Sequence, residues 1–157
     1  RLMKLYLVGV GRLRPAFREA CDDYLRRLGR MVNVEEREVR EAGQSLAPPE
    51  RRDEEARRIL ARIPAGTAIT LLDPRGSPWS SEQLASRLDS WRLAARDRAL
   101  VIGGADGLGD AMLKAAYERW SLGPLTLPHE LVRVIVTEQL YRAGTILQGH
   151  PYHRGTG

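Results

Sequence analysis

Short apolar segments typical of strands alternate along the whole chain with longer segments that have helical spacing. The strand-like segments are Met3–Val10, Val32–Val39, Ala68–Leu72, Ala99–Ile102 and Leu125–Leu127. The helix-like segments are Pro15–Leu28, Pro49–Ile63, Ser80–Trp91, Asp110–Arg119 and a final one that opens at Pro128. The third of these opens with Ser80-Ser81-Glu82-Gln83, which predicts a capping box. This alternation predicts an α/β fold with a mostly parallel sheet and helices on both faces. The second strand mixes valines with charged residues, so we expect it to be half exposed.

Ligands of parallel sheets bind beyond the carboxyl ends of the strands. Three strand ends in this chain carry distinctive loops. One follows Leu72 and opens with Asp73-Pro74-Arg75-Gly76, a turn signal that we expect to end the strand. The second is the glycine-rich loop after Ile102, and the third is the segment Ser121–Leu127. We expect a binding site among these three loops.

Length and composition are those of one compact domain. The 157 residues are 43% apolar and 29% charged, and they contain no apolar run long enough to cross a membrane and no signal-peptide pattern. We therefore expect a cytoplasmic protein that does not contact a membrane. The lone cysteine, Cys21, lies in a helical pattern and is expected to be a packed thiol.

Basic residues outnumber acidic ones, which gives a net charge of +5, and 23 of the 25 basic residues are arginine. A planar guanidinium can donate two parallel hydrogen bonds to a phosphate, so a nucleic-acid partner fits this composition. Genome composition would produce the same enrichment, and charge alone leaves both explanations open.

Two glycine pairs follow strand-like segments. Gly9-Val10-Gly11 lacks the third glycine of a dinucleotide fingerprint, because Arg14 occupies that place, so turn glycines are a better interpretation than an NAD site. Gly103-Gly104 either lets the backbone approach a flat ligand or forms a plain turn, and no Gly-Lys-Ser/Thr sequence follows to support a phosphate loop. No metal site is expected, because no cysteine or paired carboxylate lies near the histidines, which are His129, His150 and His153.

Charged residues interrupt the apolar final helix. Arg133, Glu138 and Arg142 lie among leucines and valines, where charges are expected to be paired or functional. Glu138 and Arg142, four residues apart, could equally form a plain surface ion pair. The apolar residues of this helix cover more than one stripe; they include Leu131, Val132, Val134, Ile135 and Val136. We therefore expect part of the helix to be buried against a second copy of the chain.

The C-terminal motifs resemble one family closely. They are Leu122-Gly123-Pro124-Leu125-Thr126-Leu127-Pro128-His129, Leu131-Val132-Arg133-Val134, Glu138-Gln139-Leu140-Tyr141-Arg142-Ala143 and His150-Pro151-Tyr152-His153-Arg154. In this fixed order they are similar to the RlmH (YbeA-like) group of the SPOUT class, the ribosomal RNA large-subunit methyltransferases H. Met3–Val10, Tyr24-Leu25-Arg26-Arg27 and Val101-Ile102-Gly103-Gly104 fit as well, so the resemblance covers residues 3–154 as a single SPOUT methyltransferase domain.

The resemblance implies a C-terminal trefoil knot, an obligate homodimer and S-adenosyl-L-methionine as cofactor. It also implies methyl transfer to N3 of a pseudouridine in 23S rRNA, within the assembled ribosome. The implied cofactor residues are Leu72, Gly103, Leu122, Gly123, Pro124, Leu125, Thr126 and Leu127, at the three strand ends described above. Pro124 stands where many relatives carry small polar or charged residues, and it donates no backbone N–H.

Methyl transfer from a sulfonium requires positioning of the substrate and loss of its N3 proton, but no metal. The matched residues for the substrate side are Glu138, Arg142, His153, Arg154, Arg133 and Tyr152. The cations would stabilise the ionised base, Glu138 would orient an arginine or accept the proton, and Tyr152 would stack on the base. Which group accepts the proton stays open. A ribosome-binding factor without chemistry and an NAD-linked enzyme are the alternatives.

Overall fold

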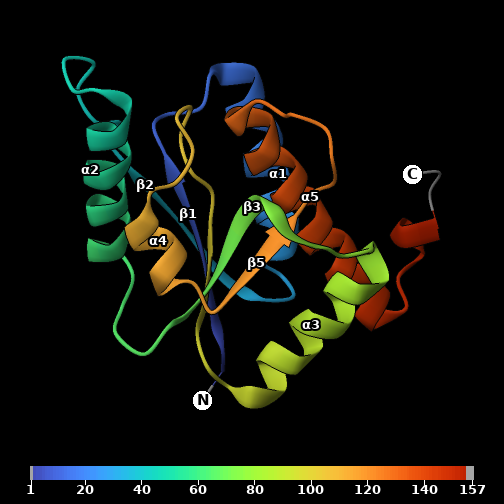
Figure 1. Ribbon diagram of the computed structural model, residues 1–157. Coiled ribbons are helices and arrows are strands. Elements are labelled where there is room, and N and C mark those ends of the chain that lie inside the picture. The colour runs from blue at the N-terminus through green and yellow to red at the C-terminus, as the bar shows by residue number, and fades with distance from the viewer. Residues whose placement is uncertain (1, 155–157) are drawn as a thin grey trace.

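The computed structural model describes residues 2–154, in which five strands form one sheet with the order β2-β1-β4-β3-β5 (Figure 1). The strands are β1 (Lys4–Val10), β2 (Asn33–Val39), β3 (Ala68–Pro78), β4 (Arg98–Val101) and β5 (Glu118–Ser121). The helices are α1 (Pro15–Leu28), α2 (Pro48–Ala61), α3 (Ser81–Ala94), α4 (Asp110–Ala115), α5 (His129–Gln148) and the short 3-10 helix η1 (Pro151–Arg154). All paired strands run parallel, which confirms the predicted α/β fold. The trefoil knot stays a prediction.

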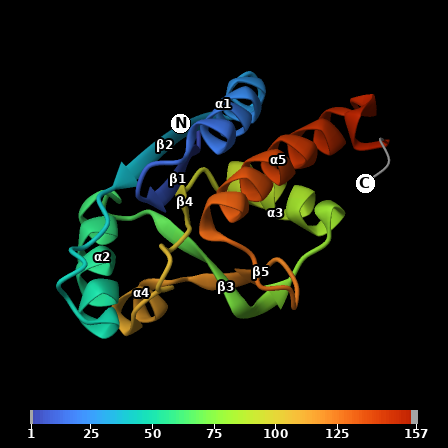
Figure 2. The same ribbon diagram turned by 90° about the horizontal axis from the view of Figure 1, so that it is seen from above.

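Helices cover both faces of the sheet, as predicted (Figure 2). One face of β1 carries Leu5 and Leu7, which pack with α1, α3 and α5, whereas the other carries Tyr6 and Val8, which pack with α2 and α4. Because both faces of β1 are buried, its sequence is a continuous apolar run. The edge strand β2 is half exposed, as its charged residues predict. None of the helices described is long and apolar enough to span a membrane.

The helix starts follow from local sequence. α1 begins at Pro15, whose fixed φ suits the first helical position and whose missing N–H costs nothing there. α3 begins with the predicted capping box: Ser80 Oγ accepts from the backbone N of Gln83 at 3.1 Å, and Gln83 Oε1 accepts from the backbone N of Ser80 at 2.8 Å. α2 starts at Pro48, one residue before the predicted start.

The prediction that Asp73-Pro74-Arg75-Gly76 ends the third strand is wrong, because β3 continues through this segment. Both Leu72 and Ser77 pair with Trp120 of β5, so residues 73–76 form a bulge rather than a turn. Gly76 passes so close to β5 that a Cβ there would lie 2.6 Å from the carbonyl carbon of Arg119. Pro74 and Gly76 thus allow β3 to leave its pairing with β5 and to resume it at Ser77.

Two further predictions fail after the fourth strand. The helix predicted for Asp110–Arg119 stops after six residues, and β5 begins at Glu118. The strand predicted for Leu125–Leu127 is a loop. The reason is a tertiary contact: the backbone N–H of Tyr117 donates to the carbonyl of Ile69, which draws this part of the chain into the sheet beside β3.

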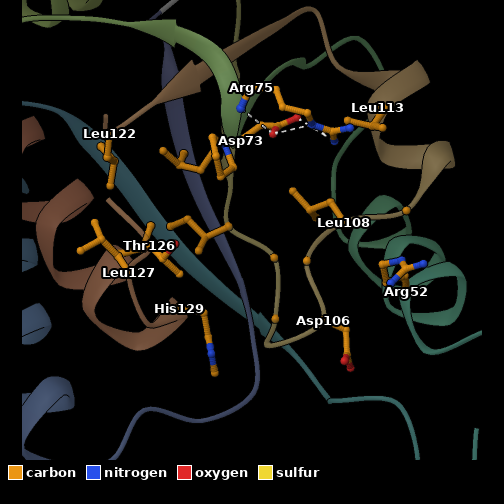
Figure 3. A pocket seen from close by; sticks show the side chains of 18 of the residues that line it. Arg52, Asp73, Arg75, Asp106, Leu108, Leu113, Leu122, Thr126, Leu127 and His129 are labelled. Atoms are coloured by element: carbon orange, nitrogen blue, oxygen red, sulfur yellow. Dashed lines mark hydrogen bonds and ion pairs between the residues drawn. The ribbon is translucent and has the colours of Figure 1, made fainter. Parts of the chain in front are cut away.

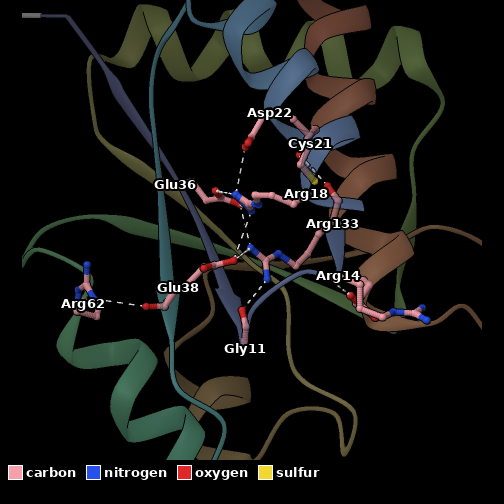
Figure 4. Close-up of polar contacts among 11 residues, drawn as sticks. Gly11, Arg14, Arg18, Cys21, Asp22, Glu36, Glu38, Arg62 and Arg133 are labelled. Atoms are coloured by element: carbon pink, nitrogen blue, oxygen red, sulfur yellow. Dashed lines mark hydrogen bonds and ion pairs between the residues drawn. The ribbon is translucent and has the colours of Figure 1, made fainter. Parts of the chain in front are cut away.

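A buried arginine joins α5 to the sheet (Figure 4). Arg133 is only 4% exposed, and its guanidinium donates to the carbonyl of Gly11 at 3.0 Å and to the carboxylates of Glu36 and Glu38 at 2.9 and 2.5 Å. Arg18 of α1 binds the same two carboxylates, so two cations neutralise two anions between α1, α5 and β2. Charges this far from water are tolerated only when they are paired.

Gly9 makes room for this arginine, since a Cβ on Gly9 would lie 2.7 Å from Nε of Arg133. The turn interpretation is confirmed for Gly11, which has a φ of +79°, and is wrong for Gly9, which lies within β1. Cys21 packs beside the same cluster with its Sγ 4.0 Å from Thr137 Oγ1, which confirms the packed thiol.

Replacing Arg133 by methionine is expected to lower the free energy of unfolding by about 3 kcal/mol, because Arg18 would be left alone with Glu36 and Glu38. Urea unfolding measures this loss. The matched control is Arg26→Met, which removes an exposed arginine with one surface ion pair and should cost less than about 0.5 kcal/mol. Equal losses in the two variants would contradict a stabilising role for the buried cluster.

Candidate functional site

A cavity of about 800 Å³ opens at the carboxyl ends of β3 and β4 (Figure 3). Its wall is built by the bulge of β3, the glycine-rich loop after β4, the loop between β5 and α5, and the starts of α2 and α5. The lining contains all eight residues predicted for the cofactor: Leu72, Gly103, Leu122, Gly123, Pro124, Leu125, Thr126 and Leu127. Three loops that are far apart in the sequence thus meet at one edge of the sheet.

Glycines shape the loop after β4. Gly107 has a φ of +80°, and its backbone N–H donates to the carbonyl of Gly104 at 3.0 Å, which closes a tight turn. At Gly103 a Cβ would lie 2.7 Å from Cγ of Leu108, whose side chain also lines the cavity. The glycine pair is therefore part of a turn and, at the same time, part of the cavity wall.

The loop between β5 and α5 leaves apolar side chains uncovered. Gly123 has a φ of +111°, and its backbone N–H donates to Ser121 Oγ at 3.0 Å. Pro124 follows, and Leu125 is 75% exposed although it lines the cavity. An apolar side chain this exposed is suited to contact a ligand or a second protein surface.

Asp73 places a negative charge in the cavity wall. Arg75 donates to its carboxylate from the backbone N at 3.0 Å and from Nε at 3.1 Å, and Arg119 lies 3.6 Å away. Burial by itself would raise the pKa of Asp73, but these hydrogen bonds and charges outweigh it and hold the pKa below its ordinary value of 3.8. Asp73 is therefore ionised at neutral pH.

A second carboxylate holds the glycine-rich loop against α2. Arg51 Nε donates to Asp106 Oδ2 at 2.8 Å, and Arg51 also donates to the carbonyl of Leu46 at 2.7 Å. The hydrogen bond lowers the pKa of Asp106 and raises that of Arg51. This ion pair joins one wall of the cavity to the segment that precedes α2.

The structure brings three of the six predicted substrate-side residues together in the C-terminal half of the molecule. Arg142 Nε donates to Glu138 Oε1 at 3.0 Å, and the Arg142 guanidinium lies 5.0 Å from the ring centroid of Tyr152. The hydrogen bond from Glu138 raises the pKa of Arg142, and burial together with a hydrogen bond to Tyr24 raises the pKa of Tyr152 to about 12. Both groups therefore keep their protons at neutral pH.

Of the other three predicted residues, Arg133 lies apart from these. Arg133 belongs to the buried cluster on the sheet, and its contacts are those of a structural residue. Arg154 is exposed at the end of η1, and the side chain of His153 lies outside the part of the chain that is described. None of the five described side chains lines the cavity of its own chain.

Sequence reasoning missed several residues that line the cavity; these include Asp73, Arg75, Asp106, Leu108, Trp120, His129 and Val132. A signal existed for Asp73, because it directly follows the predicted strand Ala68–Leu72 of a parallel sheet. No comparable signal existed for Trp120, which stacks on Trp79 with ring centroids 5.2 Å apart. Within residues 2–154, no group of three or more His, Cys, Asp or Glu residues is arranged to hold a metal ion.

Comparison with known proteins defines the class of this molecule. The family model described as a predicted SPOUT methyltransferase matches residues 3–153, nearly the whole chain. The chain therefore belongs to the SPOUT methyltransferase family, in agreement with the parallel sheet and the loop-lined cavity at its carboxyl edge.

Curated relatives narrow the class further. The chain is 44% identical over 155 residues to the ribosomal RNA large subunit methyltransferase H of Xanthomonas oryzae pv. oryzae strain PXO99A, with 97% of this chain and 99% of the relative covered. It is 43% identical over 157 residues to the protein of the same name from Xylella fastidiosa strain Temecula1, with 98% and 99% covered. These matches confirm the resemblance to the RlmH group.

Two solved structures share the fold. A probable methylase family protein from Haemophilus influenzae Rd KW20 aligns with a TM-score of 0.54 and 12% identity, covering 92% of this chain and 66% of that one. The SpoU methyltransferase AviRb from Streptomyces viridochromogenes aligns with a TM-score of 0.51 and 14% identity, covering 96% and 62%. At these identities the likeness concerns the fold alone.

Proposed function

We propose that this chain is an S-adenosylmethionine-dependent methyltransferase that modifies N3 of a pseudouridine in 23S rRNA of the assembled large ribosomal subunit. The observation that carries the proposal is a single cavity lined by all eight residues that match the cofactor motif of the family. The full-length relatives named as ribosomal RNA large subunit methyltransferases support the choice of substrate. One domain, residues 3–154, would carry both binding and chemistry.

The cavity suits a nucleoside sulfonium. Its volume of about 800 Å³ lies within the range of about 300–1,000 Å³ typical of sites for ligands of this size. Leucines line it, which suits an adenine ring, and the four aspartates of its lining outnumber the two arginines, which favours a cationic ligand. When bound, the cofactor supplies an electrophilic methyl group with its own leaving group.

The chain's own residues position the pseudouridine and favour the loss of its N3 proton. Arg142 is oriented by Glu138, and a guanidinium beside the carbonyls that flank N3 stabilises the ionised base. Tyr152, whose pKa is raised to about 12, serves as a hydrogen-bond donor or stacking surface and not as the proton acceptor. Arg154 and His153 lie in the same C-terminal segment and add positive charge and hydrogen-bond donors.

We further propose that the enzyme is a homodimer and that the second copy completes each site. The cavity meets the first turn of α5, whereas Arg142 lies about 20 Å further along that helix at 1.5 Å per residue. Half-buried apolar residues remain on α5; they are Leu131, Val132, Val134 and Ile135. A two-fold contact across α5 would bury them and bring the C-terminal segment of one copy to the cavity of the other.

Methyl transfer from labelled S-adenosylmethionine to purified large ribosomal subunits tests the proposed function. We expect label in 23S rRNA of intact subunits, mapped to N3 of a pseudouridine by mass spectrometry, and little label in naked rRNA. Cofactor binding measured by calorimetry accompanies the assay. Normal cofactor binding without transfer to either substrate would indicate a ribosome-binding factor without chemistry and would overturn the proposal.

Replacing Gly103 by valine is expected to weaken cofactor binding at least tenfold, or about 1.4 kcal/mol. The new side chain would collide with Leu108 and push it into the cavity. Calorimetry on the folded variant measures the affinity. The control is Gly43→Val, because a Cβ on Gly43 would meet nothing nearer than Ser45 Oγ at 3.6 Å. Unchanged affinity in the folded Gly103 variant would place the cofactor elsewhere.

Mixing two inactive variants tests whether the site is shared between copies. Gly103→Val disables the cavity, and Arg142→Ala disables the substrate side while leaving cofactor affinity nearly intact. In a dimer with shared sites, a one-to-one mixture regains about a quarter of wild-type turnover, because half of the dimers are mixed and each has one intact site. Sites built within one copy would regain no turnover, and a monomer by sedimentation would exclude the dimer.

A further inference from the structure

We propose that Tyr24 and Arg27 of α1 are positioning residues that hold the C-terminal segment Pro151–Arg154 in place for methyl transfer. The proposal rests on the proposed function, because this segment carries three of the groups assigned to the substrate side. Neither α1 residue lines the cavity. They act through Tyr152.

A column of rings and guanidinium groups runs from α1 to η1. The Arg27 guanidinium lies 5.7 Å from the ring centroid of Tyr24 and 5.6 Å from that of Tyr141. The two tyrosine rings are 6.1 Å apart, and Tyr141 meets Tyr152 edge to face at 4.7 Å. Arg142 covers the ring of Tyr152 from α5 at 5.0 Å. Aromatic pairs and cation–π contacts at these distances are attractive.

The segment also packs against the C-terminal end of α5. α5 ends at Gly149 with a φ of +69°, and His150 donates its backbone N–H to the carbonyl of Thr145 at 2.8 Å. Within the segment, the backbone N of Tyr152 donates to Nδ1 of His150 at 3.1 Å. Through Tyr141, the ring of Tyr152 connects the segment to α1 as well as to α5, and the column from α1 sets its orientation.

Two features distinguish a positioning role of Tyr24 and Arg27 from general packing. Tyr24 packs on Tyr141, which meets Tyr152 edge to face, and the Tyr24 side chain, after burial, helps to raise the pKa of Tyr152. Arg27 is 41% exposed, so its removal leaves no cavity in the core. A displacement of Tyr152 would move Arg154 with it, and errors of about 1 Å in a reacting geometry cost up to about a hundredfold in rate.

Arg26 provides a matched control on the same helix. It is adjacent to Arg27, carries the same charge and pairs with the same carboxylate, since Arg26 lies 2.6 Å and Arg27 3.3 Å from Asp23. No ring contact is formed by Arg26 among the residues described. Arg26→Ala therefore removes an equal charge without disturbing the column.

The experiment compares Arg27→Ala, Tyr24→Ala and Arg26→Ala in the full-length protein. We expect kcat/KM for large ribosomal subunits to fall about tenfold or more in the first two and to stay within twofold of wild type in the third. Cofactor affinity by calorimetry should stay unchanged in all three. Arg27→Lys should restore most of the activity, because an ammonium group keeps the cation over the rings.

Hydrogen exchange of the amides of residues 149–154 reports docking independently of catalysis. We expect faster exchange in Arg27→Ala and Tyr24→Ala than in wild type or Arg26→Ala. Unchanged exchange in both variants overturns the proposal even if activity falls. A different result would show that Arg27 contacts RNA phosphate directly. In that case Arg27→Ala alone loses activity, and the slope of log KM against log salt concentration decreases by about one. The positioning role would then be wrong.

The two proposals fail in distinguishable ways. If wild-type protein transfers no methyl group to subunits or rRNA, the proposed function fails, and the positioning role fails with it. If wild-type protein is active and exchange shows that the variants release the segment while kcat/KM stays within twofold of wild type, only the positioning role is overturned.

Discussion

The position of the C-terminal helix depends on one buried guanidinium. Arg133 reaches from α5 to the carbonyl at the end of β1 and to two carboxylates of β2, and an arginine of α1 completes the neutralisation. A buried guanidinium such as that of Arg133 does not stabilise the fold more than apolar packing would unless all of its partners are present. The arrangement therefore holds helix and strands in one relative orientation. Val132 and His129, which line the cavity, precede Arg133 on the same helix and take their positions from it.

The cavity depends equally on how β3 and β5 meet. The bulge at residues 73–76 lets the chain leave the ladder after Leu72, present Asp73 and Arg75 to the cavity, and return to pair again. Only glycine at position 76 permits the close passage over Arg119. A cavity wall that contains charged residues is thus built into a strand, which keeps it more rigid than a free loop.

The cavity and the group formed by Glu138, Arg142 and Tyr152 lie at opposite ends of α5 within one chain. The cavity is lined by leucines and by carboxylates that include the ionised Asp73 and Asp106, whereas the other group contains Arg142 and Tyr152, whose pKa values are raised. Leu125 is exposed and several apolar residues of α5 are only half buried, which fits the proposed contact with a second copy. The same separation explains why mutations at the two ends are expected to affect affinity and turnover differently.

The alternation of patterns was sufficient to predict the parallel α/β sheet with helices on both faces, the start of α1 at Pro15, the capping box at Ser80 and the three loops at the carboxyl edge. These features depend on local spacing and on rules for parallel sheets that apply to any chain. The family motifs predicted eight cofactor residues, and all eight line one cavity. They did not separate Arg133 from Arg142, because both are arginines on the same apolar helix.

Tertiary contacts decided the remaining features, which are the bulge in β3, the strand β5 and the surroundings of Arg133. Asp73-Pro74-Arg75-Gly76 is a bulge and not a turn because β5 pairs with β3 on both sides of it, and Glu118–Ser121 is a strand because its pairing with β3 outweighs its helical pattern. Arg133 is structural because two carboxylates from a strand nearly a hundred residues earlier surround it. Local sequence determined most of the helices and strands, since these depend on side-chain periodicity. Which polar groups are buried together, and which face the cavity, depends on partners distant in sequence and is decided only when the chain packs.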